Sequence, residues 1–311
     1  MTNEITSNQR KQLRNLGISG VEDAVEELNN NLEKDNIQDY VIEKGDVFKS
    51  YVKDFVTKTI LEMATPNTYA NQEVKSNYSY LSGYKGAHSI DDQISILKNY
   101  NWGKEINWKL NDKQKTLLKK SPNGSEGWFI VPFDKTMITD HDAEKEEVVD
   151  YGKQLEMVLD FLKQSRNGKL INWREGKLGS KYYRRSKRLT KAVRKLWETQ
   201  GCPEDVILVS AQFGIKHAGR SVNRASVVIF GMEYPIGSYE TCVMLLTHSE
   251  RLLDFNDLWI DCPGDEYAPD GDGDFSKSPC LYFSDVKLGF GTRDVSDARG
   301  FYGSVSGFLP Q

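Results

Sequence analysis

The stretch DVILVSAQF at residues 205–213 opens a series of apolar runs that decides the expected fold. The runs that follow are ASVVIFGM (225–232), ETCVMLLTH (240–248), LWID (258–261) and CLYFSDVKLGF (280–290). Turns rich in Gly, Pro and Asp separate them, and no helical period intervenes. Strands spaced this closely favour an antiparallel sandwich or barrel. We therefore expect a β-rich domain over residues 201–311.

The chain before this domain, residues 1–172, is predicted to be mainly helical. Apolar residues recur at helical spacing in residues 21–32 and again in residues 46–64. Ser19 and Asp46 stand where the N-caps of these helices would be needed. The chain is therefore expected to be α+β, with a helical N-terminal region followed by the β-rich C-terminal domain.

Three further elements are expected before the β-rich domain. Ser89 and Asp92 have the spacing of a capping box, which predicts a helix from this point to about residue 98. The aromatic and β-branched stretch GWFIVPF, at residues 127–133, predicts a strand. An amphipathic pattern predicts a longer helix over about residues 147–165.

The composition is that of an ordinary globular protein, with 28% charged and 38% hydrophobic residues among 311. No apolar run approaches the roughly 18 residues of a membrane span. The first residues are polar, so a secretory signal is not expected. Four cysteines then fit reduced thiols. We expect a soluble, cytoplasmic protein.

The net charge of −4 conceals a strong asymmetry along the chain. Residues 173–200 hold ten basic and two acidic residues, a net charge of +8. Residues 201–311 hold 16 acidic and eight basic residues, a net charge of −8, which leaves −4 for residues 1–172. Asymmetry of this kind gives information about partners rather than about the fold.

The basic block, residues 173–200, is expected to be an amphipathic helix centred on KYYRRSKRLTKAVRKLWE at residues 181–198. One apolar stripe is expected to consist of Leu189, Ala192, Val193, Leu196 and Trp197. A phosphate backbone is the commonest partner for so many cations, and tyrosines can stack on bases. The predicted nucleic-acid-binding residues are Arg174, Lys177, Lys181, Tyr182, Tyr183, Arg184, Arg185, Lys187, Arg188, Lys191, Arg194 and Lys195. His217, with Lys216 and Arg220, could extend this surface.

The basic block is also compatible with three further roles. Its cations could pair with acids of the same chain, lie on an anionic membrane surface, or dock on an acidic partner. We expect a non-enzymatic binding protein that contacts nucleic acid or another polyanion, with the β-rich domain as a scaffold. The alternative is an assembly subunit of a viral, mobile-element or cellular particle that associates with itself through charge pairing.

An acidic loop raises the question of a metal. Asp270, Asp272 and Asp274 stand at alternate positions among glycines, so their oxygens could converge on Ca²⁺ or Mg²⁺. The loop is not an EF-hand, because Phe275 and Leu281 occupy positions that need Gly and Glu. A solvated turn is the competing interpretation.

A third hypothesis is a metal-dependent phosphodiesterase or nuclease. Carboxylates would hold the cation, lysines would orient the phosphate, and a histidine would move a proton. The residues for these roles are Asp261, Asp265, Glu266, Lys277, Lys287 and His248. No nucleotide-binding glycine motif is present, and no nucleophilic arrangement can be deduced from residue order, so no catalytic residue is assigned.

Overall fold

The computed structural model describes residues 68–134, 137 and 151–310. The chain divides into two compact units, Met1–Pro66 and Asn67–Gln311, and the described residues belong to the second. The helices expected over residues 21–32 and 46–64 lie outside the described residues.

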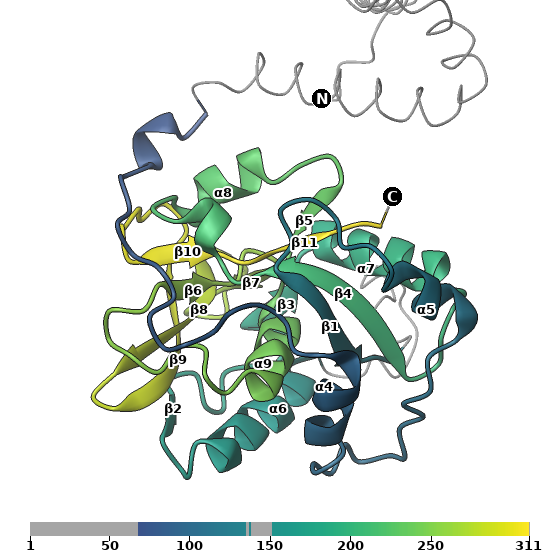
Figure 1. Ribbon diagram of the computed structural model, residues 1–311. Coiled ribbons are helices and arrows are strands. Elements are labelled where there is room, and N and C mark those ends of the chain that lie inside the picture. Colours follow the sequence, from purple (N-terminus) through teal and green to yellow (C-terminus); the bar gives the residue numbers. More distant parts are fainter. Residues whose placement is uncertain (1–67, 135–136, 138–150, 311) are drawn as a thin grey trace, which may run out of the picture. The chain divides into compact units, whose positions relative to one another are not determined.

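The mixed α+β class is confirmed by six α-helices and two mostly antiparallel sheets within the described ranges (Figure 1). The four-stranded sheet has the order β1 (Gly127–Pro132), β4 (Val206–Gln212), β11 (Ser306–Phe308) and β5 (Glu233–Pro235). All of its neighbouring strands are antiparallel. Because β1 pairs directly with β4, the boundaries expected at residues 172 and 200 fall inside one compact unit.

The seven-stranded sheet lies on the left of Figure 1. Its main path runs β10 (Tyr302–Ser304), β6 (Trp259–Asp261), β8 (Lys277–Ser284), β7 (Asp265–Tyr267) and β3 (Tyr183–Arg185). On the other side of β8, β9 (Lys287–Asp294) pairs with β8, and β2 (Leu170–Asn172) pairs with β9. Val305 separates β10 from β11, so the C-terminal segment passes from one sheet to the other. This crossing joins the two sheets.

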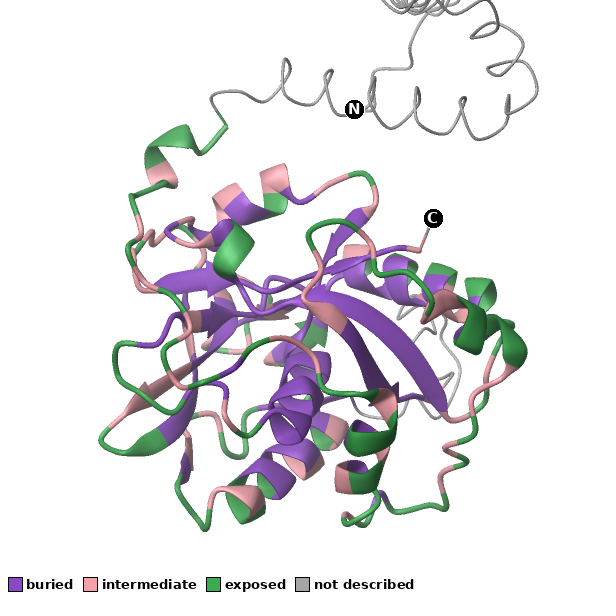
Figure 2. Cartoon of the chain, viewed as in Figure 1, coloured by how far each residue is buried: buried purple, intermediate pink, exposed green. Residues whose placement is uncertain are grey.

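The helices pack on these sheets around a central, fully buried helix. They are α4 (Ile90–Leu97), α5 (Asp112–Leu117), α6 (Tyr151–Ser165), α7 (Lys187–Thr199), α8 (Val222–Val228) and α9 (Ser238–Thr247). Every residue of α9 is buried, and α9 packs against α4, α6 and β1 (Figure 2). Two short 3-10 helices, η1 (Ala70–Gln72) and η3 (Ile215–His217), complete the elements. No described helix is long and apolar enough to cross a membrane.

Two of the expected strands were wrong. Residues 240–247 belong to α9, and residues 225–228 belong to α8. A helix that is buried on all sides has no polar face, so its sequence shows no period that would distinguish it from a buried strand. The start of α8 did carry a signal, because the Ser221 hydroxyl accepts a hydrogen bond from the Arg224 N–H as an N-cap.

Three other expected elements, β1, β4 and α4, are present in the part of the chain that the structure describes. The stretches 127–133 and 205–213 contain β1 and β4. Ser89 caps α4 by accepting a hydrogen bond from the Asp92 N–H. The run at residues 280–290 is the centre of a hairpin rather than one strand, and it contains parts of β8 and β9.

Two buried glutamine side chains form hydrogen bonds with backbone groups of β1 and β4 that no neighbouring strand pairs. The Gln93 amide donates to the Trp128 carbonyl at 2.9 Å and accepts from the Ile130 N–H at 3.0 Å. Gln200, at the end of α7, makes the same pair of bonds with the backbone of Leu208 at 2.7 and 2.8 Å. These bonds imitate a neighbouring strand. They also fix the C-terminal end of α7 on β4.

Candidate functional site

The basic block contains a turn region, one short strand and one helix rather than a single helix. Residues 183–185 form β3, which pairs with β7, so that Arg184 lies opposite Glu266. The helix α7 begins only at Lys187, because the Ser186 hydroxyl caps it by accepting from the Leu189 N–H. The expected helix over residues 173–200 is therefore shorter than the sequence indicated.

The apolar stripe expected on α7 is confirmed. Leu189, Ala192, Val193 and Leu196 are buried, and α7 packs with this face on β4 and β5. Trp197 is half-buried and donates its indole N–H to the Pro203 carbonyl at 2.8 Å. The opposite face of α7 is therefore the one that can contact a partner.

Arg185 points into the interior. Its side chain is buried and pairs with the equally buried carboxylate of Glu240. The guanidinium also lies 4.6 Å from the centre of the Tyr151 ring and donates to the Met137 carbonyl at 3.1 Å. Burial by itself would lower the pKa of Arg185, but the charge of Glu240 raises it above its ordinary value. Arg185 is thus part of the core.

Tyr183 belongs to the same interior network. Its hydroxyl donates to the Asp265 carboxylate at 2.5 Å, and the Tyr151 hydroxyl donates to the same group at 3.0 Å. The two tyrosine rings are stacked with centroids 5.3 Å apart. Burial, reinforced by the negative charge of Glu240, raises the pKa of Asp265 to about 6. Tyr183 is therefore not available to stack on a base.

Two further arginines of the basic block, Arg184 and Arg174, contact residues of the acidic C-terminal region. Arg184 forms an ion pair of 2.6 Å with Glu266, and its guanidinium lies 3.6 Å from the centre of the Phe275 ring. The guanidinium of Arg174 lies 5.2 Å from the centre of the Tyr267 ring. Both arginines thus have partners between residues 266 and 275.

The tertiary structure brings the acidic loop against the basic block. A β-carbon on Gly271 would lie 2.6 Å from Lys181 Cε and 2.8 Å from the Tyr182 ring, so the loop backbone touches these side chains. The ammonium groups of Lys177 and Lys181 lie 5.8 and 5.5 Å from the centre of that ring. The acids of the loop therefore offset part of the positive charge of residues 174–185.

The loop itself resembles a solvated turn. Asp270, Asp272 and Asp274 are exposed, and the Asp272 carboxylate accepts a hydrogen bond from the Asp274 N–H at 3.0 Å. Across the described residues, no group of three or more His, Cys, Asp or Glu side chains is arranged to hold a metal ion. The geometry thus gives no support to the expected Ca²⁺ or Mg²⁺ site.

The residues considered for a phosphodiesterase have separate partners. Asp261 pairs with Arg293 at 3.0 Å, and Lys277 pairs with Asp294 at 3.3 Å. His248 is buried, and burial lowers its pKa to about 4. Asp265 is bonded to Tyr183, and Glu266 is paired with Arg184. The residues considered for the phosphodiesterase therefore do not come together in one site.

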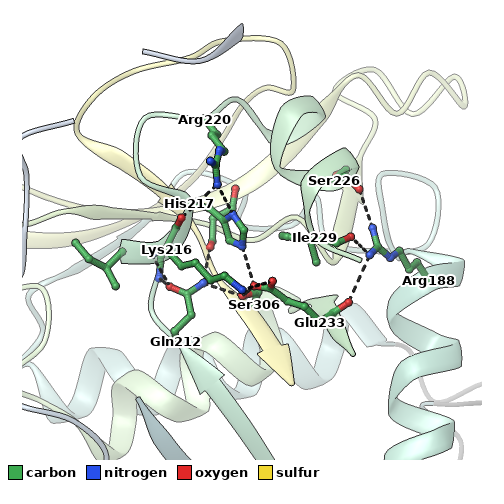
Figure 3. A network of polar contacts seen from close by, with 12 residues as sticks. Arg188, Gln212, Lys216, His217, Arg220, Ser226, Ile229, Glu233 and Ser306 are labelled. Atoms are coloured by element: carbon green, nitrogen blue, oxygen red, sulfur yellow. Dashed lines mark hydrogen bonds and ion pairs between the residues drawn. The ribbon is translucent and has the colours of Figure 1, made fainter. Parts of the chain in front are cut away.

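Arg188 lies on α7, but its side chain bonds to backbone carbonyls of the same chain (Figure 3). Its guanidinium donates to the carbonyls of Ser226 at 2.8 Å, Ile229, and Glu233 at 3.5 Å. Partial burial lowers the pKa of Arg188. Because Glu233 begins β5, Arg188 covers backbone at the edge of the four-stranded sheet.

The basic residues around His217 are also engaged (Figure 3). The Glu233 carboxylate bonds to His217 Nε2 at 2.7 Å and to Lys216 Nζ at 2.5 Å, and it accepts from the Ser306 hydroxyl at 2.5 Å. Burial opposes its ionisation, but these contacts, first that with His217, lower the pKa of Glu233 to about 2. Arg220 bonds to His217 Nδ1 at 2.9 Å. This cluster joins η3, β5 and β11 and does not extend a phosphate-binding surface.

Four exposed lysines of α5 and α7 form what we call the lysine surface: Lys113, Lys187, Lys191 and Lys195. The last three follow one another every four residues on α7, about 6 Å apart along the helix axis. Lys113, from α5, lies beside the C-terminal end of α7, because a β-carbon on Gly201 would be 3.1 Å from Lys113 Cδ. Figure 2 shows both helices with exposed outer faces, and Figure 1 shows them close together.

The sequence interpretation missed Lys113. The segment DKQKTLLKK at residues 112–120 contains four lysines and one acidic residue, which was the available signal. Its position beside α7 depends on Gln114, which donates to the Gln200 side chain at 3.2 Å across 86 residues of sequence. A contact of that range cannot be deduced from local pattern.

The chain matches no protein-family model, no curated protein and no solved structure.

Proposed function

We propose that this protein binds a polyanion, first of all nucleic acid, through the lysine surface. The observation that carries the proposal is the outward position of Lys187, Lys191 and Lys195 on a helix whose opposite face is buried. This helix carries five basic residues and one acidic residue. Lys191 and Lys195 have no carboxylate partner among the residues that the structure describes.

The chemistry of lysine supports contact with phosphates rather than with bases. Each ammonium is a point charge on a flexible stem, so a row of them can follow a phosphate backbone without fixed geometry. Such contacts position a nucleic acid but do not read its sequence. We therefore expect binding of DNA and RNA with little sequence preference.

The test is the affinity of the full chain for labelled nucleic acid, measured by fluorescence anisotropy. Suitable probes are single-stranded and duplex DNA and RNA of about 20 nucleotides. If about four phosphates are neutralised, the affinity for duplex DNA should fall about 100-fold between 50 and 200 mM salt. The release of counterions is the physical reason for this dependence.

A charge-reversal variant locates the site. The substitutions Lys113→Glu, Lys191→Glu and Lys195→Glu together should reduce affinity at least as strongly as the salt change, because they replace attraction by repulsion. The matched control is Lys98→Glu, Lys163→Glu and Lys169→Glu, which makes the same charge change at exposed lysines on or beside α4 and α6. The control should keep most of the affinity.

Two results would contradict the proposal. One is binding that is insensitive to salt or equal in the two triple variants. The other is a protein that binds no nucleic acid but forms salt-sensitive oligomers in sedimentation experiments, lost in the Lys113, Lys191 and Lys195 variant. That result would favour the charge-paired assembly subunit.

A further inference from the structure

We propose that the outer face of the seven-stranded sheet binds a chain of neutral sugars. The contact surface is a line of rings that we call the aromatic row: Trp173, Trp259, Tyr282 and Phe301, with Phe255 beside Trp259. The residues of the lysine surface do not belong to it. The two proposals can therefore succeed or fail independently.

Strand register places Trp259 and Tyr282 on the side of their strands opposite Ile260 and Leu281, although Trp259 also packs against the core at one edge. Ile260 of β6 pairs with Leu281 of β8, and both are fully buried in the hydrophobic core. Side chains alternate between the two faces of a strand. Trp259 and Tyr282, which adjoin these two core residues, therefore point to the other face, where both are only half-buried.

Trp259 is the centre of the row. Its ring centroid lies 5.3 Å from that of Tyr282, 4.9 Å from that of Phe301 and 5.6 Å from that of Phe255. Phe255 is 58% exposed. The row crosses the sheet from the end of β2 over β9, β8 and β6 to β10, a span of about 19 Å at the usual strand spacing.

Two glycines let the Tyr282 ring lie against β9 at the other end of the row, whereas Phe255 and Phe301 meet Trp259 edge to face at 85° and 78°. A β-carbon on Gly289 would lie 2.5 to 2.9 Å from three atoms of the Tyr282 ring, so this ring lies directly on the backbone of β9. A β-carbon on Gly291 would lie 3.5 Å from the same ring and 3.9 Å from Trp173, which is 60% exposed. Since one face of the Tyr282 ring covers the strand, the opposite face points away from the sheet.

The charges around the row do not favour a polyanion. Within two residues of the row in sequence stand two basic residues, Arg174 and Arg299, and four acidic ones, Glu175, Asp254, Asp257 and Asp261. Affinity for a phosphate backbone needs an excess of positive charge. This rim has none, so bases of a nucleic acid are not the expected occupant.

A neutral sugar chain fits both properties of the surface. One face of a pyranose ring presents C–H bonds that pack on the negative face of an aromatic ring, and the hydroxyl groups around its edge bond to carboxylates and guanidinium groups. A row of several rings matches successive sugars of a chain rather than one monosaccharide. The occupant is therefore an oligosaccharide without charged groups.

The experiment measures binding of neutral hexasaccharides to the full chain. Cellohexaose, chitohexaose and maltohexaose serve as probes, and the readouts are tryptophan fluorescence and titration calorimetry. At least one of the three should bind. Trp173→Ala should weaken that binding about tenfold, because it removes one stacking partner.

A glycine substitution tests the position of the Tyr282 ring without removing a ring. Gly289→Ala should displace the Tyr282 ring and weaken sugar binding. The midpoint temperature of unfolding should stay close to that of the unchanged protein, because the Tyr282 ring is at the end of its side chain and can move. The matched control is Tyr69→Asn, which removes an exposed aromatic ring outside the row and keeps a residue that tolerates positive φ. Its sugar affinity should not change.

Several outcomes would overturn this proposal. The first is the absence of binding to all three hexasaccharides. The second is equal affinity in Trp173→Ala and Gly289→Ala and in the unchanged protein. The third is self-association or nucleic-acid binding that Trp173→Ala abolishes while sugar binding is missing, which would make this face an interface for another macromolecule.

Discussion

The two halves of the basic block hold equal numbers of cations, but Arg184 and Arg185 of the first half pair with carboxylates, whereas Lys191 and Lys195 of the second have no carboxylate partner among the described residues. Residues 174–185 and residues 187–195 each contain five basic residues. In the first half, Arg185 pairs with Glu240 in the interior and Arg184 pairs with Glu266 at the surface. In the second half, lysines extend from the outer face of α7. The number of basic residues in a segment therefore does not give the number that are accessible to a partner.

Backbone geometry explains the difference. In β3, successive side chains point to opposite sides of the strand. For this reason Arg184 is exposed and its neighbour Arg185 is buried. In α7, the period of 3.6 residues collects the apolar side chains on one face and the lysines on the other. Arg188 is the exception, because it reaches backbone carbonyls near β5.

The largest expected effect comes from breaking the interior pair. Arg185→Met leaves Glu240 as an uncompensated buried charge, and the free energy of unfolding should fall by about 3–5 kcal/mol in urea unfolding experiments. The double variant Arg185→Met with Glu240→Gln should recover part of this loss. Lys191→Met, on the exposed half, should change stability by no more than about 0.5 kcal/mol. Equal effects at Arg185 and Lys191 would contradict the comparison.

The pH dependence of stability sharpens the same contrast. The pKa of Asp265 is raised on folding from 3.8 to about 6. The protonated form is thus favoured in the folded state, and its stabilising contribution is lost as the pH rises through about 6. Between about pH 4 and 7, the free energy of unfolding should fall by about 3 kcal/mol relative to Asp265→Asn. A difference between the two proteins that stays constant with pH would disprove this assignment.

The smallest effect is expected at the surface pair. Arg184→Ala removes a solvent-exposed ion pair with Glu266 and a stacking contact with Phe275. Exposed pairs contribute about 0–1 kcal/mol, so thermal unfolding should shift only slightly. A shift as large as that of Arg185→Met would mean that Arg184, too, is part of the interior.

Local pattern was sufficient for elements with a cap, a short β-branched run or an amphipathic period. The helix cap at Ser89, the strands β1 and β4, and the apolar stripe of α7 all follow from spacing within one segment. The same method failed for α9, whose residues are buried on every side. A fully buried helix and a buried strand have the same hydrophobic pattern, and only tertiary packing decides between them.

The candidate site was predicted in part. The sequence indicated a basic surface at residues 173–200, and the lysines of α7 are exposed there. It did not indicate that Tyr183 and Arg185 would be buried, since alternation in a short strand becomes visible only once its partner β7 is known. Nor did it indicate that Gly271 and its acidic neighbours would contact Lys181.

The sequence by itself determined the α+β class, the charge of each segment and the amphipathic character of α7. These properties depend on residue types and on spacing within about ten residues, which the chain order records directly. The tertiary structure alone decided which cations are accessible, where the acidic loop lies and how aromatic residues of β6 and β8 meet those beside β2 and β10. Accessibility and contact depend on strand pairing between distant segments, and that pairing is set by the packing of the whole unit.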